Sequence, residues 1–281
     1  MIVEASPSAT RSLVRERRRS GQRIGVVPTM GALHSGHVSL VEAARAQCDC
    51  VVATIFVNPT QFAPGEDFEQ YPRTLADDLA QCEAAGADLV FTPNTDEMYL
   101  PGAQSTVVVS ELTRVLEGAH RPAHFDGVTT VVAKLFHITE PDRAYFGQKD
   151  YQQQLVIRQM VQDLDFGLEI VTCPIIREDD GLALSSRNRY LSAAERERSL
   201  ILNAALAHAV EQAAKTVGPE QIQREMEQML DRADGVEPDY AVVVNPDTLQ
   251  PALPGDAAAV ALVAARVGAT RLIDNRILQF R

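Results

Sequence analysis

The chain has 281 residues, of which 46% are hydrophobic and 23% charged, and this composition is typical of a folded protein and excludes a disordered one. At ~150 residues per domain, the length predicts about two domains. The formal net charge of −12 argues against broad nucleic-acid binding, which needs a basic face. It also requires that any polyanionic substrate be met by a local cluster of cations.

Four cysteines are too few for a disulfide scaffold, and no Cys-x-x-Cys pair exists, so we expect buried free thiols in a reducing compartment. Cys48 and Cys50 are predicted to lie at a helix end and a strand start. The N-terminal segment has no apolar stretch of signal-peptide length, and its run of arginines at 15 and 17–19 is expected on a solvated helix face. The longest apolar run, 257–265, is far short of the ~20 residues that span a membrane. We therefore expect a soluble, cytoplasmic protein without a membrane partner.

Over the first two thirds of the chain, short apolar runs alternate with segments of helical spacing. The runs predict strands at residues 23–27, 51–57, 89–92, 106–109, 144–146 and 168–173. The helical spacing predicts helices at residues 38–47, 74–85, 128–138 and 150–164. Strands separated by helices of this length favour a parallel sheet, and hence a doubly wound, Rossmann-like α/β domain over residues 1–174. Such domains bind ligands at the carboxyl ends of their strands.

The pattern changes after Pro174. Ser192 and Glu195 form a capping box that opens a helix running to about Lys215. Pro219 is suited to the first turn of a second helix. Apolar runs predict strands at 240–244, 258–265 and 272–274. These elements predict a small α+β domain over residues 175–281, which we expect to act as a lid.

The first candidate for chemistry is the loop Pro-Thr-Met-Gly-Ala-Leu-His-Ser-Gly-His at residues 28–37, between the first long strand and its helix. Free backbone N–H groups and the positive end of the helix dipole make such a junction a phosphate site. The alternative is a capped loop with two surface histidines, His34 and His37. From composition, one His-x-Gly-His arises by chance in about 0.7% of such chains, which favours function.

Two further segments have the right chemistry and position. Gly-Gln-Lys-Asp at 147–150 follows a predicted strand, where Lys149 would reach a phosphate; the alternative is a plain turn with a helix cap. Ser-Ser-Arg at 185–187 offers hydroxyl donors and a guanidinium for a triphosphate, and taken alone it would be an ordinary linker. Loops at 58–61 and 121–125 belong to the same edge of the sheet. Neither a Gly-x-Ser-x-Gly elbow nor a Walker A loop occurs.

Four segments in this order, PTMGALHSGH, FVNPTQF, AYFGQKDYQQ and ALSSRNRYL, closely resemble the pantoate–β-alanine ligase family. The likeness covers essentially the whole chain; the His-x-Gly-His element alone would indicate only the wider nucleotidyltransferase superfamily. The resemblance implies an ATP-dependent ligation in two steps. Pantoate and ATP give pantoyl adenylate and pyrophosphate, and β-alanine then displaces AMP to give pantothenate. It also implies Mg²⁺ as the companion of ATP and a homodimer.

The resemblance further implies site residues. Those for ATP are Met30, Gly31, Ala32, Leu33, His34, Ser35, Gly36, His37, Gly147, Gln148, Lys149, Asp150, Ile176, Leu184, Ser185, Ser186 and Arg187. Among them, the catalytic groups are His37 as proton donor, His34, Lys149 and Arg187. The residues for pantoate and β-alanine are Gln61, Gln153 and Asn58. Candidates for the neighbourhood of Mg²⁺ are Asp77, Asp78 and Gln81.

Three positions depart from the family pattern: Leu184 stands where Met is usual, Ser35 where Glu is frequent, and Ala123 where Gly is frequent. None removes a group that the chemistry needs. Two other functions remain open. A nucleotidyltransferase acting on a phosphorylated substrate would share the histidine loop but not explain Gln61 and Gln153. A nucleotide-binding regulator would bind ATP without releasing pyrophosphate.

Overall fold

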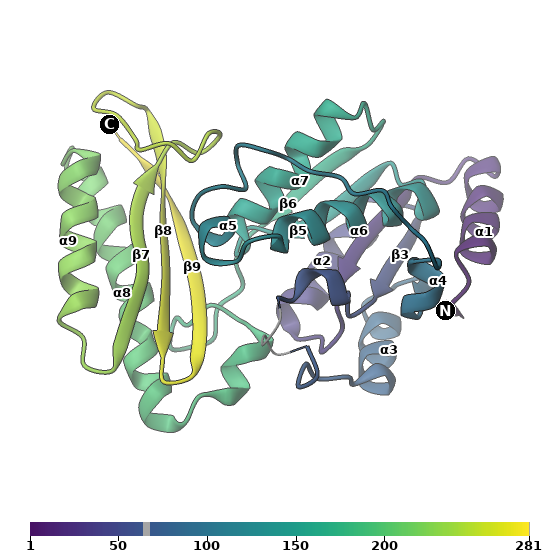
Figure 1. Cartoon of the computed structure of the whole chain (residues 1–281), viewed down its shortest axis with the longest axis horizontal. Coiled ribbons are helices and arrows are strands. Elements are labelled where there is room, and N and C mark those ends of the chain that lie inside the picture. Colours follow the sequence, from purple (N-terminus) through teal and green to yellow (C-terminus); the bar gives the residue numbers. More distant parts are fainter. Residues whose placement is uncertain (64–67, 281) are drawn as a thin grey trace. The chain divides into compact units, whose positions relative to one another are not determined.

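The computed structural model describes residues 1–63 and 68–280. The chain folds into two compact units (Figure 1). The first unit comprises Met1–Gly147 and Gln152–Pro174, and the second comprises Gln148–Tyr151 and Ile175–Arg281. The four residues 148–151, which follow β5 and include the first residue of α7, therefore belong to the second unit.

The first unit is built on a six-stranded sheet in which every neighbouring pair is parallel. Its strand order is β1-β4-β3-β2-β5-β6. The strands are β1 (Ile2–Glu4), β2 (Ile24–Thr29), β3 (Cys50–Ile55), β4 (Leu89–Phe91), β5 (Arg143–Gly147) and β6 (Glu169–Cys173). The central strands β2 and β3 are buried along most of their length, as expected for a parallel sheet covered on both faces.

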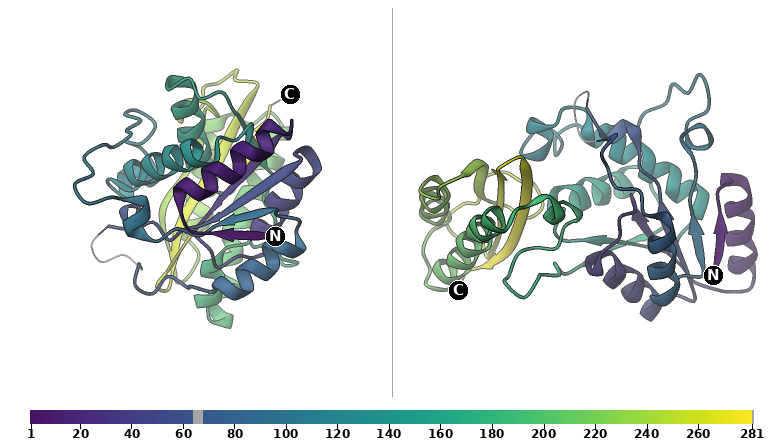
Figure 2. Two further views of the ribbon diagram at one scale, coloured as in Figure 1. Left: turned by 90° about the vertical axis from the view of Figure 1, so that its right-hand side faces the viewer. Right: turned by 90° about the horizontal axis from the view of Figure 1, so that it is seen from below.

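Helices cover both faces of this sheet (Figure 2). Packed on one face are α1 (Pro7–Arg19) and α6 (His124–Thr139), and on the other α2 (Ser35–Gln47) and α3 (Leu75–Ala84). Helix α7 (Tyr151–Asp163) connects β5 to β6. The shorter helices are α4 (Thr95–Met98), α5 (Glu117–His120) and the 3₁₀ turn η1 (Pro59–Gln61). The predicted doubly wound α/β class is confirmed.

All four cysteines are buried and free, as predicted. Cys48 caps the C-terminal end of α2 and Cys50 begins β3, which confirms the placement expected for this pair. Burial and the nearby Asp88 carboxylate raise the pKa of the Cys50 thiol to about 11.

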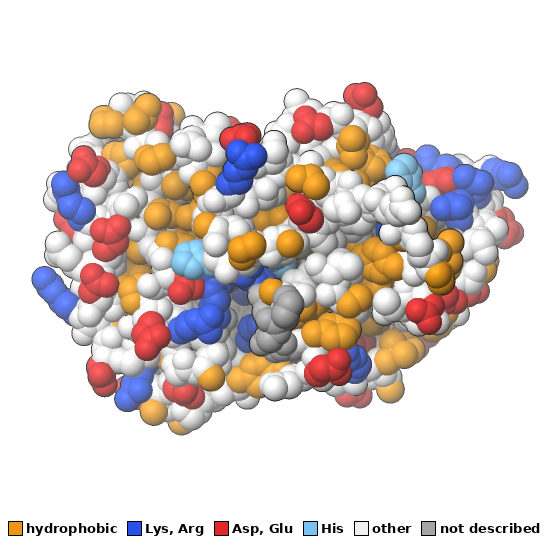
Figure 3. Space-filling view, viewed as in Figure 1, with side chains coloured by type: hydrophobic (Ala, Val, Ile, Leu, Met, Phe, Trp, Pro, Cys, Tyr) orange, Lys and Arg blue, Asp and Glu red, His pale blue; other side chains and the backbone are white. Residues whose placement is uncertain are grey.

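The run of arginines on α1 is exposed to solvent, as the sequence indicated. Side chains of Lys and Arg gather where α1 lies (Figure 3). However, Arg15 pairs with Glu140 at 2.6 Å and Arg18 with Asp142 at 3.0 Å. These pairs attach α1 to the segment that follows α6.

The strand predicted at residues 106–109 does not form. Instead, the extended backbone at Val107 bonds to side chains of α6: its N–H donates to Thr130 Oγ1 at 3.0 Å, and its carbonyl accepts from Thr129 Oγ1 at 2.5 Å. These hydroxyls supply the partners that a neighbouring strand would have supplied. The valine-rich composition alone therefore gave a wrong prediction here.

In the second unit, two helices pack on one face of the antiparallel sheet β7-β8-β9 (Figure 1). The elements are η2 (Ser186–Tyr190), α8 (Ala193–Ala214), α9 (Pro219–Asp231), β7 (Val236–Val244), β8 (Ala258–Val267) and β9 (Thr270–Gln279). The Ser192–Glu195 capping box opens α8 as predicted. A core of small and medium apolar side chains, such as Ala205, Leu206 and Ala261, joins the helices to the sheet.

Strand β9 is longer than the three residues predicted for it. Asp274 and Asn275 are polar yet nearly fully buried, with 4% and 1% exposure, so they interrupt the apolar alternation that marks a strand. Pairing of β9 with β8 continues through both residues. Within the part of the chain that the structure describes, no helix has the length and apolar character needed to cross a membrane.

Candidate active site

The loop after β2 is held in an uncommon backbone conformation. Gly31 has φ +81°, and a Cβ on it would meet Asp78 Oδ2 at 3.0 Å and Ile55 at 3.1 Å. Ala32 also has a positive φ, +52°, which costs a non-glycine residue energy. The turn brings the chain from the strand directly onto the start of α2.

Asp78 on α3 fixes this turn. It is 2% exposed, and its carboxylate accepts from the backbone N–H groups of Ala32 at 2.9 Å and Leu33 at 2.8 Å. The hydroxyl of Thr74 donates to the same carboxylate at 3.2 Å. Both carboxylate oxygens therefore accept hydrogen bonds from groups of the protein itself. Among the described residues, no cluster of three His, Cys, Asp or Glu side chains is arranged for a metal ion.

The two histidines of the loop lie at the first turn of α2. His34 is the N-cap residue, and its Nδ1 accepts from the N–H of Gly36 at 3.1 Å. An accepting Nδ1 places the proton of a neutral imidazole on Nε2, which makes Nε2 a donor. The rings of His34 and His37 lie 4.1 Å apart between centroids at an angle of 37°. Both imidazoles therefore lie at the N-terminus of a 13-residue helix, where the helix dipole favours binding of an anion.

The loop after β3 carries two buried amides. Asn58 is fully buried, and its Nδ2 donates to Gln61 Oε1 at 3.1 Å and to the carbonyl of Gly127 at 3.2 Å. Its Oδ1 accepts from Tyr99 Oη at 2.9 Å and from the hydroxyl of Thr60 at 3.0 Å. This network fixes the Gln61 carboxamide oxygen as an acceptor and leaves its NH₂ group as the donor for a ligand oxygen.

Three residues that the sequence analysis did not assign support Gln61 from α6 and the segment before it. The carbonyl of Gln61 faces His124 Nδ1 at 2.8 Å and accepts from Arg121 Nη2 at 3.2 Å. Gly127 permits the helix to approach, since a Cβ there would lie 2.2 Å from the carbonyl oxygen of Thr60. The polar loop at 121–125 is a sequence signal for Arg121 and His124 but not for Gly127. Contacts between segments this remote in sequence leave no local pattern.

Three consecutive glutamines lie in the first turn of α7, and they differ in their contacts. Gln152 donates to the carbonyls of Leu112 and Val115, and Gln154 accepts from Arg158 and Thr172. Gln153 is half-buried and, within the described residues, makes no hydrogen bond through its side chain. Of the three, it is the one whose amide remains available to a ligand.

The sheet order brings three of the predicted loops to one edge. Strand β2 lies between β3 and β5, and the loops after these strands begin at Met30, Phe56 and Gln148. All three strands are parallel, so their carboxyl ends meet at the same edge. The chain proceeds to opposite sides of β2 on its way to β3 and β5, which makes the boundary between β2 and β5 a topological switch point, where doubly wound folds bind ligands.

The remaining predicted residues lie in the second unit. Lys149 has a side chain 20% exposed, and its Nζ lies 3.7 Å from Asp150 Oδ2. The N–H of Leu184 donates to the carbonyl of Ile176 at 3.0 Å. Ser185 caps η2 by accepting from the N–H of Arg187 at 3.3 Å. The predicted nucleotide residues of this unit therefore occupy two segments, 148–150 and 176–187.

An ion-pair network supports the 176–187 segment. Arg196 on α8 pairs with Glu178 at 2.7 Å and Asp180 at 2.6 Å. Glu178 also accepts from Asn188 Nδ2 at 2.9 Å. The hydrogen bond from Arg196 holds the pKa of Glu178 below its usual value. The carboxylate thus joins α8 to η2.

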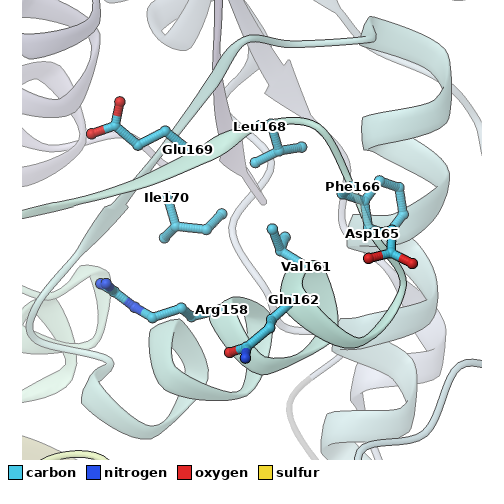
Figure 4. A pocket seen from close by; sticks show the side chains of 8 residues that line it. All are labelled: Arg158, Val161, Gln162, Asp165, Phe166, Leu168, Glu169 and Ile170. Atoms are coloured by element: carbon cyan, nitrogen blue, oxygen red, sulfur yellow. The ribbon is translucent and has the colours of Figure 1, made fainter.

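A separate hollow of about 450 Å³ lies between α7 and β6 (Figure 4). It is lined by Arg158, Val161, Gln162, Asp165, Phe166, Leu168, Glu169 and Ile170. None of these is a predicted site residue. The hollow is flanked by the amino end of β6, away from the carboxyl ends where the loops gather.

Comparison of the sequence with known proteins identifies a family and several relatives. The pantoate–β-alanine ligase family model matches residues 2–277. The chain is 57% identical to the pantothenate synthetase of Acidobacterium capsulatum over 258 residues, which are 91% of this chain and 86% of that protein. It is 54% identical to the pantothenate synthetase of Rhodopirellula baltica over 283 residues, which cover 99% of each chain.

Solved structures agree with the sequence comparison. The pantothenate synthetase of Thermus thermophilus superposes with a TM-score of 0.93 at 46% identity, covering 98% of this chain and 99% of that one. The pantoate–β-alanine ligase of Francisella tularensis, complexed with β,γ-ATP and β-alanine, superposes with a TM-score of 0.80 at 33% identity, covering 99% and 97%. The chain therefore belongs to the pantoate–β-alanine ligase family.

Proposed function

We propose that this chain condenses pantoate with β-alanine at the expense of ATP, through pantoyl adenylate, to give pantothenate, AMP and pyrophosphate. The observation that carries the proposal is the convergence of the histidine loop, the Asn58–Gln61 loop and the end of β5 at one sheet edge in a member of this family. The histidine loop offers donors to phosphate groups, and the Asn58–Gln61 loop offers an uncharged amide to the oxygens of a hydroxy acid. A ligase that activates a carboxylate with a nucleotide needs both.

In the first step, a carboxylate oxygen of pantoate attacks the α-phosphorus of ATP, and the bond to pyrophosphate breaks. The pantoate carboxylate is already nucleophilic, so the difficulty is the approach of two anions. Donors aimed at the developing charge address this, and each is typically worth about 3–4 kcal/mol in the transition state. The overall charge of −12 makes such local donors more necessary.

We assign these donors to His34, His37, Lys149 and Arg187, with His37 as proton donor. The accepting Nδ1 of His34 supports its use of Nε2–H toward a phosphate oxygen. The backbone from Met30 to Ser35 and Gly36 would line the triphosphate at the start of α2. The other nucleotide contacts that we assign are Gly147, Gln148, Asp150 on the ribose, Ile176 on the adenine, and Leu184, Ser185 and Ser186.

In the second step, the neutral amine of β-alanine attacks the acyl carbon of the adenylate. The bond from the acyl carbon to the phosphate oxygen breaks, AMP leaves, and the nitrogen loses a proton. We assign pantoate binding to Gln61 and Gln153, with Asn58 orienting Gln61 through the 3.1 Å hydrogen bond. Exclusion of water protects the mixed anhydride from hydrolysis, and we assign a lid function to residues 175–281.

Mg²⁺ is proposed to enter with ATP, as the counter-ion of its phosphates. Mg²⁺ is often bound by substrate phosphates, retained waters and only one or two carboxylates. The contacts of Asp78 agree with this, because its oxygens already bind backbone N–H groups. We also propose a cytoplasmic homodimer, on the strength of the family resemblance.

The test follows the products. Continuous release of AMP and pyrophosphate over many turnovers should require pantoate, ATP and β-alanine together. Without the amine, labelled pyrophosphate should exchange into ATP in a pantoate-dependent manner, because the adenylate forms reversibly. Formation of ADP and phosphate would exclude adenylation, and exchange without pantoate would indicate another substrate.

The assigned donors give a second test. His37→Ala and Lys149→Ala should each lower kcat by roughly 10²–10³, the usual cost of losing one transition-state donor. Circular dichroism should show both variants folded. Unchanged turnover in either variant would remove that residue from the mechanism without affecting the family assignment.

A further inference from the structure

Asn275 on β9 has every group of its side chain engaged with the segment that carries Lys149. It is 1% exposed, and its Nδ2 donates to the carbonyls of Gln148 and Lys149, both at 2.9 Å. Its Oδ1 accepts from Gln148 Nε2 at 3.1 Å. All these residues belong to the second unit. Two adjacent carbonyls are thus held by the two N–H bonds of a single buried amide.

The neighbouring Asp274 reaches the other predicted nucleotide segment. Its carboxylate binds Arg177 with two hydrogen bonds, of 2.6 and 2.9 Å, and the Asp274 side chain is 4% exposed. Arg177 also donates to the carbonyl of Gly181 at 3.1 Å, within the turn that leads to Leu184. Consecutive residues of β9 therefore hold the backbone at Lys149 and the turn before the Ser-Ser-Arg sequence.

We propose that Asn275 is a positioning residue for Lys149. We also propose that the Asp274–Arg177 pair holds the segment 176–187 at a fixed position relative to Asn275. This proposal rests on the role assigned to Lys149 above. A flexible lysine stem reaches a phosphate accurately only if its backbone is fixed, and a misplacement near 1 Å costs about 10²-fold in rate. The short segment 148–150 has no secondary structure of its own, so Asn275 supplies that restraint.

The decisive variant is Asn275→Asp, which keeps the size of the side chain and replaces two donors by acceptors facing two carbonyl oxygens. Losing a pair of buried hydrogen bonds should lower kcat of pantoate-dependent pyrophosphate exchange and raise KM for ATP, together by roughly 10- to 100-fold. KM for pantoate should stay within about twofold, since Gln61 and Gln153 are untouched. A simple loss of folded protein would lower kcat and leave both KM values unchanged.

A matched control lies on the same sheet. Arg271 on β9 binds Asp239 on β7 at 2.6 Å, with side-chain exposures of 16% and 19%. Asp239→Asn breaks this pair without touching residues 148–150. It should change the kinetic constants by no more than about twofold, because the pair joins β7 to β9 and neither residue is assigned to substrate binding.

A double-mutant cycle with Lys149→Ala tests whether Asn275 acts through the lysine. In the Lys149→Ala background, Asn275→Asp should reduce exchange by less than about threefold, because the group it positions is absent. An equal loss in both backgrounds, or an unaltered Asn275→Asp single variant, would overturn the positioning role while Lys149→Ala remains impaired. An unimpaired Lys149→Ala variant would instead refute the assigned role of Lys149, and the inference with it.

Discussion

At the scale of single residues, Asp78 shows how a buried carboxylate serves a loop. Its hydrogen-bond partners are two backbone N–H groups and the hydroxyl of Thr74. A buried charge needs such donors to offset its desolvation. In return, Asp78 stabilises the positive φ of Ala32, a conformation that alanine rarely adopts. The shape of the loop therefore depends on a residue 46 positions away.

Asp78→Asn should lower kcat/KM for ATP by roughly 10- to 100-fold, because the NH₂ of asparagine would face a backbone N–H group. The kinetic constants should be measured across Mg²⁺ concentrations. The neighbouring Asp77 is exposed, and Asp77→Asn should leave kcat/KM unchanged. A loss in both variants that excess Mg²⁺ restores would mean that these carboxylates serve the metal instead.

Gly127 contributes through its missing side chain as well as through its carbonyl, which accepts from Asn58 Nδ2. Gly127→Ala would place Cβ 2.2 Å from the carbonyl oxygen of Thr60 and 2.9 Å from the N atom of Gln61. Backbone cannot yield cheaply, so α6 should move away from η1 and displace Gln61. We expect the melting temperature to fall and KM for pantoate to rise more than KM for ATP. Gly167→Ala, with open space at its Cβ, is the matched control and should show neither effect.

At the scale of elements, most of the first unit was predictable because buried parallel strands and amphipathic helices leave strong periodic signals. Elements β2 to β6 and helices α2, α3, α6 and α7 follow those signals. The failures have physical causes: Thr129 and Thr130 replace a strand partner at residues 106–109, and buried Asp274 and Asn275 hide the length of β9. The three-residue β1 is too short to leave a pattern.

The positions of the candidate loops at the strand ends were predictable to the same extent. Its loops carry recognisable residues at strand ends, as with His34 and Gln61. Their supports do not, because Asp78, Gly127 and Asn275 act from elements remote in sequence. A hydrogen bond or a close approach between distant segments leaves no periodic trace in one sequence.

Glu178, which accepts a hydrogen bond from Asn188 of η2, should make the stability of the protein depend on pH. The folded pKa of Glu178 lies below its ordinary value of 4.5, chiefly through the hydrogen bond from Arg196. A depressed carboxyl pKa stabilises the folded protein above pH 4.5, and this contribution disappears as the pH falls through the folded value. Glu178→Gln should therefore destabilise the protein near neutrality by about 1 kcal/mol.

The measurement is urea unfolding of both proteins between neutral pH and the acid range. The difference in unfolding free energy should shrink as the pH drops below 4.5. Glu237→Gln, at an exposed position on β7, serves as the control for the loss of one carboxylate. A difference for Glu178→Gln that stays constant with pH would assign the effect to packing.

At the scale of the whole molecule, the four cysteines all lie in the first unit and are buried. Burial raises the pKa of Cys82 to about 11, with a contribution from Asp78, and that of Cys50 to about 11 as well. The thiolate is the reactive form, so both should resist a thiol reagent at about pH 8 in the native protein. Titration in denaturant should reveal four thiols, and rapid native labelling of Cys50 or Cys82 would contradict the structure.

The membership of Gln148–Tyr151 in the second unit limits how this protein can be recombined. A crossover between relatives at Pro174 would transfer β9 but leave its four-residue counterpart behind. Chimeras joined at Pro174 would combine Asn275 of one parent with residues 148–151 of another. Their activity should therefore depend on whether these two segments still fit each other. Exchange of the second unit as a module requires two simultaneous replacements, and laboratory evolution by shuffling should favour progeny that inherit both from one parent.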